Sequence, residues 1–299
     1  MSGHHDSSYA PRSTFNLASF GIYVVIALFA LICLFPMLLT VIVSLSSEDS
    51  ITKHGYSLFP DRLSLDAYRL VFAQGHVLAQ AYFVSVFVTI IGTVLAVVIT
   101  GMAAYTLANK NVKYRNGLAL YFFITMLFSA GLVPWYIMCT KLGLKDNIWA
   151  LIIPIQLFNP FNMFLVRNFM DSLPNELRES AYMDGANDMR IAFQIYLPLC
   201  VPVLASICLF YAISYWNDWF NAIMLVSNKN LYPVQYLLLQ IKSNIDALKM
   251  IPSGALNATV PAETTKMATV VLTIGPIVLL YPFLQRYFVK GLIIGSVKG

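Results

Sequence analysis

Residues 179–198, ESAYMDGANDMRIAFQIYLP, are polar and helix-forming, although long apolar segments lie on both sides of them. Gly185 is placed to end a first short helix, and Asn187 or Asp188 is placed to cap a second one. We therefore predict a helical hairpin over 171–198. An ordered, charged hairpin between two apolar segments is typical of a place where another protein docks.

The ends of the hairpin carry their own signals. Asp171 or Ser172 is expected to cap the first helix, with Pro174 in its opening turn and Glu176 near its positive end. Pro198 is expected to end the second helix and to open the next apolar segment.

The composition indicates an integral membrane protein. Of the 299 residues, 59% are hydrophobic and 11% are charged, and the mean hydropathy is +0.71. Soluble domains carry about 25% charged residues. The net charge of +5 is small and is spread over loops, so it gives no support to nucleic-acid binding.

Charge-free intervals predict the membrane spans, because a helix that crosses a bilayer needs about 20 mostly apolar residues. The first interval is too long for a signal-peptide core, so we expect it to be a retained anchor. The expected fold is all-α and polytopic: one transmembrane domain over 16–290, tails at 1–15 and 291–299, and six transmembrane helices at 17–45, 78–107, 117–139, 148–166, 198–226 and 267–287.

The distribution of basic residues predicts the orientation. Lys110, Lys113 and Arg115 cluster at a helix end, and the C-terminus is also basic. Because cytoplasmic loops carry an excess of Lys and Arg, both termini are predicted to be cytoplasmic. The hairpin is then cytoplasmic, and the loops 46–77 and 227–266 face outward.

Several kinds of chemistry are excluded. The sequence has no phosphate-binding loop, no dinucleotide-binding glycine pattern, and no zinc-protease or serine-hydrolase motif. We therefore expect a chain that is not an enzyme and binds no cofactor of its own. The cysteines lie in apolar runs without metal or redox spacing, so no metal site is predicted at Cys33, Cys139, Cys200 and Cys208.

One acidic residue, Asp218, interrupts a predicted span. It lies beside Asn217 and between Trp216 and Trp219. It is either an interfacial residue in an aromatic belt or part of a solvated pathway. A proton-coupled carrier would be expected to hold more intramembrane charge than this.

The hairpin resembles the EAA loop of the permease subunits of binding-protein-dependent ABC importers. That loop reads Glu-Ala-Ala, three residues, Gly, nine residues, and Ile-x-Leu-Pro. Ser180 in place of an alanine is the one departure. The matching positions are Glu179, Ser180, Ala181, Gly185, Ile195, Leu197 and Pro198.

Further segments narrow the resemblance. Asp184-Gly185-Ala186 and the tail QRYFVKGLIIGSVKG, residues 285–299, are similar to the carbohydrate-type, maltose-permease-like subfamily. The segments FSAGLVPWY, YWN and YPVQ resemble a branch that imports complex oligo- or polysaccharides.

The resemblance implies a type I importer permease fold in the bacterial cytoplasmic (inner) membrane. The chain would form half of the translocation pathway together with a second permease subunit. ATP and Mg would bind to a dimer of ATPase subunits, which receives the hairpin. The coupling residues would be Glu179, Ser180, Ala181, Asp184, Gly185, Ala186 and Pro198, with Glu179 as a polar contact, Ala181 as a site of close approach and Gly185 as the sharp exit between the helices.

Polar and aromatic residues of the fourth and fifth spans are candidates for the substrate pathway. Pro154 and Pro160 interrupt the fourth span, and irregular backbone is tolerated in a membrane where it lines a cavity. Aromatic and amide groups suit sugar rings and hydroxyls, although aromatic side chains in membrane helices more often pack or form belts. The candidates are Gln156, Asn159, Asn162, Tyr211, Tyr215, Trp216, Asn217, Asp218 and Trp219.

The loop 227–266 is too long for a simple turn, and its middle sets apolar residues beside turn formers. The resemblance implies that an extracytoplasmic solute-binding protein meets this loop. Alternatively, the loop folds over its own chain and the partner contacts 46–77. The predicted contact residues are Met250, Ile251, Pro252, Ser253 and Gly254.

A self-sufficient six-span carrier or channel is the alternative class of function. Such a protein should carry polar or titratable groups in paired, internally repeated helices. The sequence shows no such repeat.

The predicted orientation can be tested by labelling. A cysteine introduced at Asn187 should react with a membrane-impermeant reagent only from the cytoplasmic side, and one introduced at Ser253 only from outside. The reverse labelling pattern would overturn the orientation.

Overall fold

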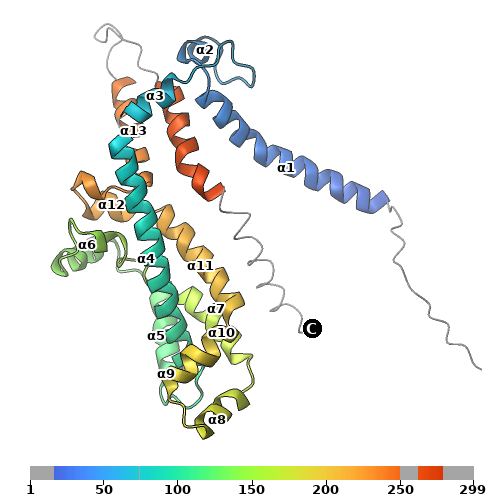
Figure 1. Ribbon diagram of the computed structural model, residues 1–299, viewed down its shortest axis with the longest axis vertical. Coiled ribbons are helices and arrows are strands. Elements are labelled where there is room, and N and C mark those ends of the chain that lie inside the picture. Colours follow the sequence, from blue (N-terminus) through green and yellow to red (C-terminus); the bar gives the residue numbers. More distant parts are fainter. Residues whose placement is uncertain (1–16, 74, 250–261, 279–299) are drawn as a thin grey trace, which may run out of the picture.

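The computed structural model describes residues 17–73, 75–249 and 262–278, and the regular elements of that part are all helices (Figure 1). Within that part, the one β-type contact is an isolated antiparallel bridge between Ser46 and Leu63. The elements are α1 (Leu17–Ser44), α2 (Glu48–His54), α3 (Asp66–Ala73), α4 (Gly75–Ala108), α5 (Arg115–Leu127), α6 (Leu132–Lys141), the 3₁₀ turn η1 (Ile148–Leu151), α7 (Pro160–Asp171), α8 (Glu176–Met183), α9 (Asp188–Ile191), the π-helical segment η2 (Ala192–Tyr196), α10 (Leu197–Leu199), α11 (Val201–Trp216), α12 (Phe220–Leu225), the 3₁₀ turn η3 (Lys229–Leu231), α13 (Val234–Lys249) and a helix over 262–278.

The long helix α4 is the axis of the bundle, and α7 and α11 pack along it (Figure 1). One side of α4 carries a small buried residue at every fourth position: Gly92, Ala96, Thr100 and Ala104. Small residues let helix backbones approach closely in a membrane. At Gly92 the fit to α11 is so tight that an added Cβ would lie 2.5 Å from Cζ of Tyr215.

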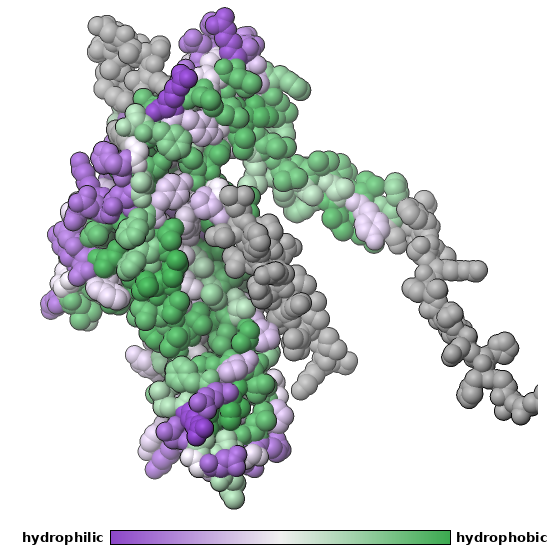
Figure 2. All heavy atoms as spheres, viewed as in Figure 1, coloured by the Kyte–Doolittle hydropathy of each residue, from purple (hydrophilic) through white to green (hydrophobic). Residues whose placement is uncertain are grey.

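On the face shown in Figure 2, apolar side chains cover the middle of the bundle and α1, and polar side chains gather at both ends and along one side. Two helices, Phe20–Ser44 within α1 and Gly75–Ala108, are each long and apolar enough to cross a membrane. They confirm the predicted spans 17–45 and 78–107. The apolar window of α1 is 0% buried in the chain, and α1 points away from the bundle (Figure 1).

The prediction of one continuous helix over 117–139 is wrong. This segment forms α5 and α6, which meet at 116°. Gly131 at the break has φ 86°, a conformation that glycine adopts without steric cost. The Ser129 hydroxyl also accepts a hydrogen bond from the Gly131 N–H at 3.2 Å, so a turn replaces the helical hydrogen bonds there.

The prediction of a continuous helix over 148–166 is also wrong. Residues 148–151 form a 3₁₀ turn, and irregular backbone follows until α7 begins at Pro160. Within the irregular part, Pro154 has no N–H to donate, and Ile155 has φ 66°, which is strained for a β-branched residue. Asn159 then caps α7, accepting hydrogen bonds from the Phe161 and Asn162 N–H groups.

The fifth predicted span, 198–226, differs at both ends. Helical structure is continuous from Asp188 to Leu199 and meets Val201–Trp216 at an angle of 84°. The hairpin's second helix therefore runs one residue past Pro198, to Leu199, and the proline in the first turn of the next helix, where no N–H is needed, is Pro202. Near the other end, helix α11 stops at Trp216 and α12 starts at Phe220.

Six spans are not confirmed by the described residues. They contain the two continuous spans and two bent helix pairs that each have the length and composition of a span. Of the predicted sixth span, 267–287, residues up to 278 are helical. The remainder of that span lies outside the described residues, as do both predicted tails.

The close approach of α4 and α11 generates a stability prediction. Gly92→Ala should lower the melting temperature of the detergent-solubilised protein, because the new methyl group collides with the Tyr215 ring and overpacking costs about 1–3 kcal/mol. Gly117→Ala, in α5, is the matched control, since nothing lies within 4 Å of its added Cβ. An unchanged melting temperature for Gly92→Ala would show that the two helices are not held this closely.

Candidate functional site

The predicted hairpin is present, and its turn is built around Gly185. Helix α8 ends at Met183, and Gly185 follows with φ 76°. The Gly185 N–H donates to the Tyr182 carbonyl at 3.0 Å, and the Ala186 N–H donates to the Ala181 carbonyl at 3.0 Å. These paired bonds form a Schellman motif, which satisfies the last carbonyls of a helix and needs a left-handed residue at this position. The prediction that Gly185 ends the helix is confirmed.

Only some of the predicted helix caps are present. Asn187 caps the second helix, as one of the two predicted alternatives, and accepts from the Arg190 N–H at 2.9 Å. Neither Asp171 nor Ser172 caps α8. The Ser172 hydroxyl donates instead to the Phe169 carbonyl at the end of α7, at 2.7 Å. Helix α8 begins two residues beyond Pro174, with Asn175 as an N-cap that makes no side-chain bond.

The Asp188 carboxylate ties the hairpin to the bundle. Its Oδ1 accepts a hydrogen bond from the Tyr105 hydroxyl, near the end of α4, at 3.3 Å. The same oxygen accepts from the Tyr182 hydroxyl of α8, and this bond raises the pKa of Tyr182 above its ordinary value. The two phenols thus join α4, α8 and α9 at a single carboxylate.

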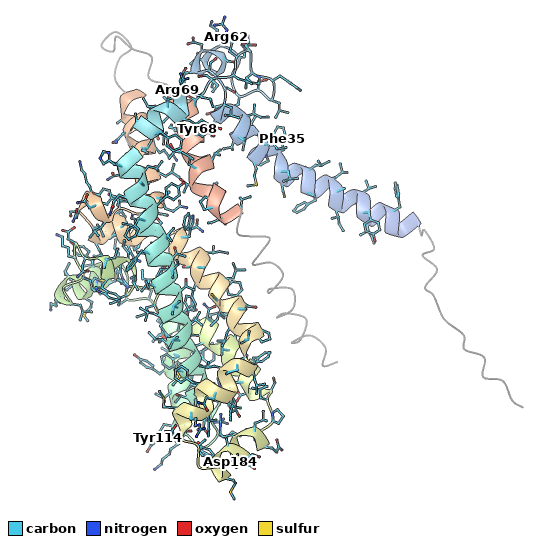
Figure 3. All side chains as sticks on the ribbon, in the orientation of Figure 1. Phe35, Arg62, Tyr68, Arg69, Tyr114 and Asp184 are labelled. Atoms are coloured by element: carbon cyan, nitrogen blue, oxygen red, sulfur yellow. The ribbon has the colours of Figure 1, made fainter. Side chains whose placement is uncertain are left out.

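The hairpin forms one end of the molecule, opposite α2 and α3 (Figure 1). Asp184 and Tyr114 both lie at this end (Figure 3). Ala181 is buried against the chain's own core, so its small side chain lets α8 pack on the bundle. The other predicted coupling residues have accessible surface: Glu179, Ser180, Asp184, Gly185 and Pro198 are exposed, and Ala186 is half-buried.

Three of the predicted pathway residues lie at the level of Thr100, about two turns before the end of α4. The Tyr211 hydroxyl lies 2.7 Å from the Thr100 hydroxyl, and it accepts a hydrogen bond from the Asn159 N–H at 3.0 Å. Asn162, one turn into α7, is buried. These groups connect α11 to both α4 and the start of α7.

Two further candidates also serve the packing of the chain. The Tyr215 hydroxyl donates to the Ile152 carbonyl at 2.9 Å. The Trp216 indole donates to the Thr273 carbonyl at 3.3 Å, which joins α11 to the helix 262–278. Both rings are buried. In contrast, Gln156 has a buried Oε1 without a hydrogen-bond partner.

Asp218 caps a helix, a role that neither sequence interpretation included. Its Oδ1 accepts from the Phe220 and Asn221 N–H groups at 3.1 and 3.2 Å, and its Oδ2 accepts from the Asn221 side chain at 2.8 Å. These bonds start α12, and the Asp218 side chain is buried. Its neighbours Asn217 and Trp219 are exposed.

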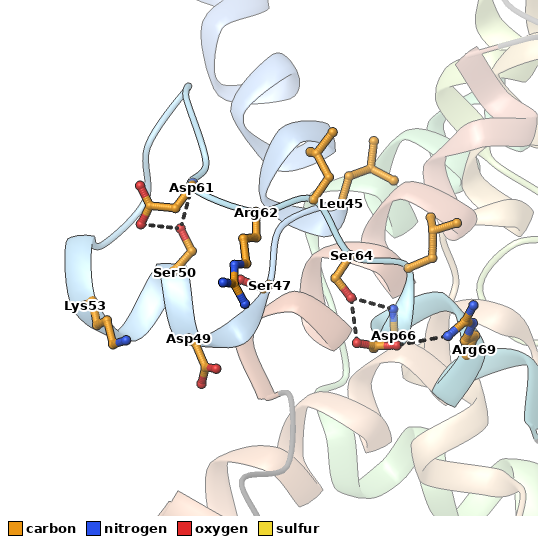
Figure 4. A pocket seen from close by; sticks show the side chains of 12 residues that line it. Leu45, Ser47, Asp49, Ser50, Lys53, Asp61, Arg62, Ser64, Asp66 and Arg69 are labelled. Carbon is orange, nitrogen blue, oxygen red and sulfur yellow. Dashed lines mark hydrogen bonds and ion pairs between the residues drawn. The ribbon is translucent and has the colours of Figure 1, made fainter.

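The opposite end of the molecule contains a cavity that the sequence did not indicate (Figure 4). It has a volume of about 990 Å³ and lies between the end of α1, α2 and the start of α3. Charged side chains of both signs line it, with Arg69 3.4 Å from Asp66. It falls within the loop 46–77, the alternative contact region for a partner.

The carboxylates of Glu48 and Glu263 link this end of the molecule, at α2 and the loop after it, to the helix 262–278 by hydrogen bonds. Glu48 accepts hydrogen bonds from the Glu263 and Thr264 N–H groups at 2.9 and 3.0 Å, at the positive end of that helix. The Tyr56 hydroxyl donates to Glu263 at 2.7 Å, which raises the pKa of Tyr56 to about 12. These pairs lie more than two hundred residues apart in sequence, so no local pattern could have indicated them.

The predicted binding-protein contact, residues 250–254, lies outside the described residues. Among the residues that are described, no group of three or more His, Cys, Asp or Glu side chains is arranged to hold a metal ion.

Comparison with known proteins gives consistent matches along the chain. The family model of the binding-protein-dependent transport system inner membrane component matches residues 96–294. The chain is 39% identical over 280 residues to the polygalacturonan/rhamnogalacturonan transport system permease protein YtcP of Bacillus subtilis, covering 93% of this chain and 97% of the relative. It is 28% identical over 296 residues to the arabinooligosaccharides transport system permease protein AraQ of Halalkalibacterium halodurans, covering 96% and 99%.

A solved structure shares the fold. It is the crystal structure of a bacterial ABC transporter involved in the import of the acidic polysaccharide alginate, and one of its chains matches with a TM-score of 0.78 and 31% identity, covering 93% of this chain and 100% of that one. This chain is therefore a multi-pass permease subunit and not an enzyme. It belongs to the family of inner membrane components of binding-protein-dependent transport systems.

Proposed function

We propose that this chain is a permease subunit of an ABC importer for oligo- or polysaccharides. The relatives named for polygalacturonan, rhamnogalacturonan and arabinooligosaccharides, and the structural neighbour from an alginate importer, support this substrate class. A second permease subunit, an ATPase dimer and an extracytoplasmic solute-binding protein would complete the importer. The chain itself would bind neither ATP nor Mg.

The hairpin is the proposed coupling element. The single observation that carries this proposal is the geometry of α8: it is a short helix at the end of the bundle, closed by a Schellman turn, with exposed Glu179, Ser180 and Asp184. Eight helical residues are about 12 Å long, which suits a lever inserted into another protein. ATP-driven closure of the ATPases would push this lever and change the access of the pathway.

The proposed orientation places the hairpin and both termini in the cytoplasm. The loops 46–77 and 227–266 would then face the solute-binding protein, with residues 250–254 as the proposed contact. The cavity between α1 and α3 would lie on this outer side.

The proposed pathway narrows to the candidates with accessible side chains. Trp219, in the break between α11 and α12, presents an indole to the outside of the chain. Asn217 beside it is exposed, although its amide also donates to the Ile213 carbonyl at 2.9 Å and accepts from the Gln235 side chain at 3.1 Å. Tyr211 and Tyr215 would shape the pathway indirectly, since their hydroxyls are used in bonds within the chain.

Docking at the hairpin can be tested at Gly185. Gly185→Trp should abolish ATPase co-purification, because the indole adds bulk at the docking surface and overpacking costs about 1–3 kcal/mol, or about a tenfold loss of affinity per 1.4 kcal/mol. Nothing in this chain lies within 4 Å of an added Cβ, so the indole would meet a steric clash only in the partner. Tryptophan at φ 76° also strains the turn itself, and thermal unfolding of the isolated variant measures that separate cost.

Gly185→Asn is the matched control, because asparagine tolerates positive φ and adds little volume. The asparagine variant should still bind the ATPase and support oligosaccharide uptake in proteoliposomes. Wild-type uptake by Gly185→Trp would refute the docking assignment.

The two kinds of pathway candidate should respond differently to substitution. Tyr211→Phe should lower the melting temperature, because it removes bonds worth about 0.5–1.5 kcal/mol each, and should leave the apparent affinity for the oligosaccharide unchanged. Trp219→Ala should raise the apparent KM for uptake about fivefold, equivalent to about 1 kcal/mol, without a change in melting temperature. Uptake kinetics and thermal unfolding of the same preparations measure both effects. The opposite pattern would place Tyr211, and not Trp219, in contact with the substrate.

A further inference from the structure

Arg178 lies on the inner side of α8, between two aromatic rings. Its residue surface is 6% exposed. The guanidinium carbon is 5.1 Å from the centroid of the Tyr105 ring and 4.7 Å from that of the Tyr196 ring. The two rings also contact each other, with centroids 5.3 Å apart and planes at 72°.

The Arg178 side chain therefore joins three elements that are distant in sequence. Tyr105 belongs to the end of α4, and Tyr196 closes η2, the segment that leads into α10 and α11. Arg178 itself belongs to α8, the proposed lever. We define these three residues as the arginine clamp.

The guanidinium of Arg178 stacks on the two rings, and the Asp188 carboxylate, which accepts a hydrogen bond from Tyr105, adds a negative charge beside the same ring without a direct ion pair to Arg178. Within the part of the chain that the structure describes, Arg178 forms no ion pair, and its Nε has no hydrogen-bond partner. A buried cation without a counter-ion is unfavourable unless its surroundings compensate. The faces of two tyrosine rings supply that compensation, since a flat guanidinium stacks on aromatic faces better than an ammonium group does.

The other contacts of α8 are smaller or more exposed than the arginine clamp. The C-terminal turn of α8 at Gly185 has open space around it. Ala181 packs through a single methyl group, and Tyr182 reaches Asp188 with its hydroxyl alone. Two contacts of α8 reach both α4 and the helical segment before α11: the Asp188 carboxylate, which binds Tyr182 and Tyr105, and the arginine clamp. Asp188 is exposed, whereas Arg178 is the buried member of the pair.

We propose that Arg178 is a positioning residue that locks α8 to the membrane helices, so that a displacement of α8 moves α4 and α11 with it. This inference rests on the proposed coupling function of the hairpin and deepens it. The inference assigns the transmission of force to one side chain that lies outside the motif residues Glu179–Ala186.

The first measurement tests the clamp without reference to coupling. Spin labels at Glu176, in α8, and at Asn111, after α4, report the distance between the two elements by pulsed electron paramagnetic resonance in the assembled complex, with the native cysteines replaced. Arg178→Met keeps an unbranched apolar stem and removes the charged guanidinium, and should broaden the distance distribution. Arg190→Met is the matched control: Arg190 is exposed on the same hairpin, and among the described residues its side chain bonds Gln194, at 2.9 Å. It should leave the distribution narrow.

The second measurement tests transmission. In proteoliposomes, Arg178→Met should lower the number of oligosaccharides transported per ATP hydrolysed about fivefold, with ATPase binding retained. Arg178→Lys keeps a cation between the rings and should recover most of this ratio. If Arg178 had a merely structural role, its loss would reduce assembly of the complex and ATP hydrolysis together, and the number of oligosaccharides transported per ATP would stay the same.

Each outcome decides a separate point. A narrow distance distribution in Arg178→Met would show that Arg178 does not hold α8 in place. A broad distribution with an unchanged number of oligosaccharides per ATP would show that the clamp does not transmit movement to the membrane helices. Failure of the wild-type hairpin to bind the ATPase would refute the proposed coupling function, whereas the distance measurement would still test the clamp. If Arg178→Met does not assemble, Tyr105→Leu and Tyr105→Phe replace it. Tyr105→Leu removes the ring, and should broaden the distance distribution and lower the number of oligosaccharides transported per ATP. Tyr105→Phe retains the ring and should change neither quantity. Equal behaviour of these two variants overturns the proposal.

Discussion

The close contact between α4 and α11 is the constraint on which the other helices depend. At Gly92 the backbone of α4 lies directly against the Tyr215 ring, with no room for a side chain. In lipid, apolar surface alone does not drive helices together, so this fit and the hydrogen bonds beside it must hold the pair. The Thr100–Tyr211 pair, two turns further along α4, is such a bond, and it is fully enclosed by the two helices and α7.

The same two tyrosines also stabilise the least regular part of the described chain. Between η1 and α7 the backbone leaves helical geometry, and its polar groups need partners in a membrane. The Tyr215 hydroxyl satisfies the Ile152 carbonyl, and the Tyr211 hydroxyl satisfies the Asn159 N–H. Because both hydroxyls lie on the packed helix α11, they fix the irregular segment in place, and α7 starts at a defined position that leads directly into the hairpin.

The sequence predicted the features that depend on neighbouring residues. The Gly185 turn, the Asn187 cap and the two long apolar spans follow local rules, and all three are present. The bends between α5 and α6 and before α11 were not predicted. The length of an apolar interval without charges does not indicate where the backbone hydrogen bonds of a helix are interrupted. Asp218 shows the same limit: its position inside an apolar run suggested an interface or a pathway, whereas its carboxylate caps α12 with partners only two and three residues ahead. The arginine clamp joins residues too far apart for any periodic pattern to register.

The π-helical segment η2 has a consequence for the angular position of the side chains around it. A π turn holds one more residue than the α turn that it replaces, and each residue of an α-helix advances by about 100°. Side chains before and after η2 are therefore out of phase by roughly that angle relative to an uninterrupted helix. Tyr196 closes the segment, and its ring faces Arg178 and Tyr105. The extra residue thus sets the direction in which the Tyr196 side chain leaves the helix axis. Shortening η2 by one residue would turn the ring away from α8, although the composition of the helix would hardly change.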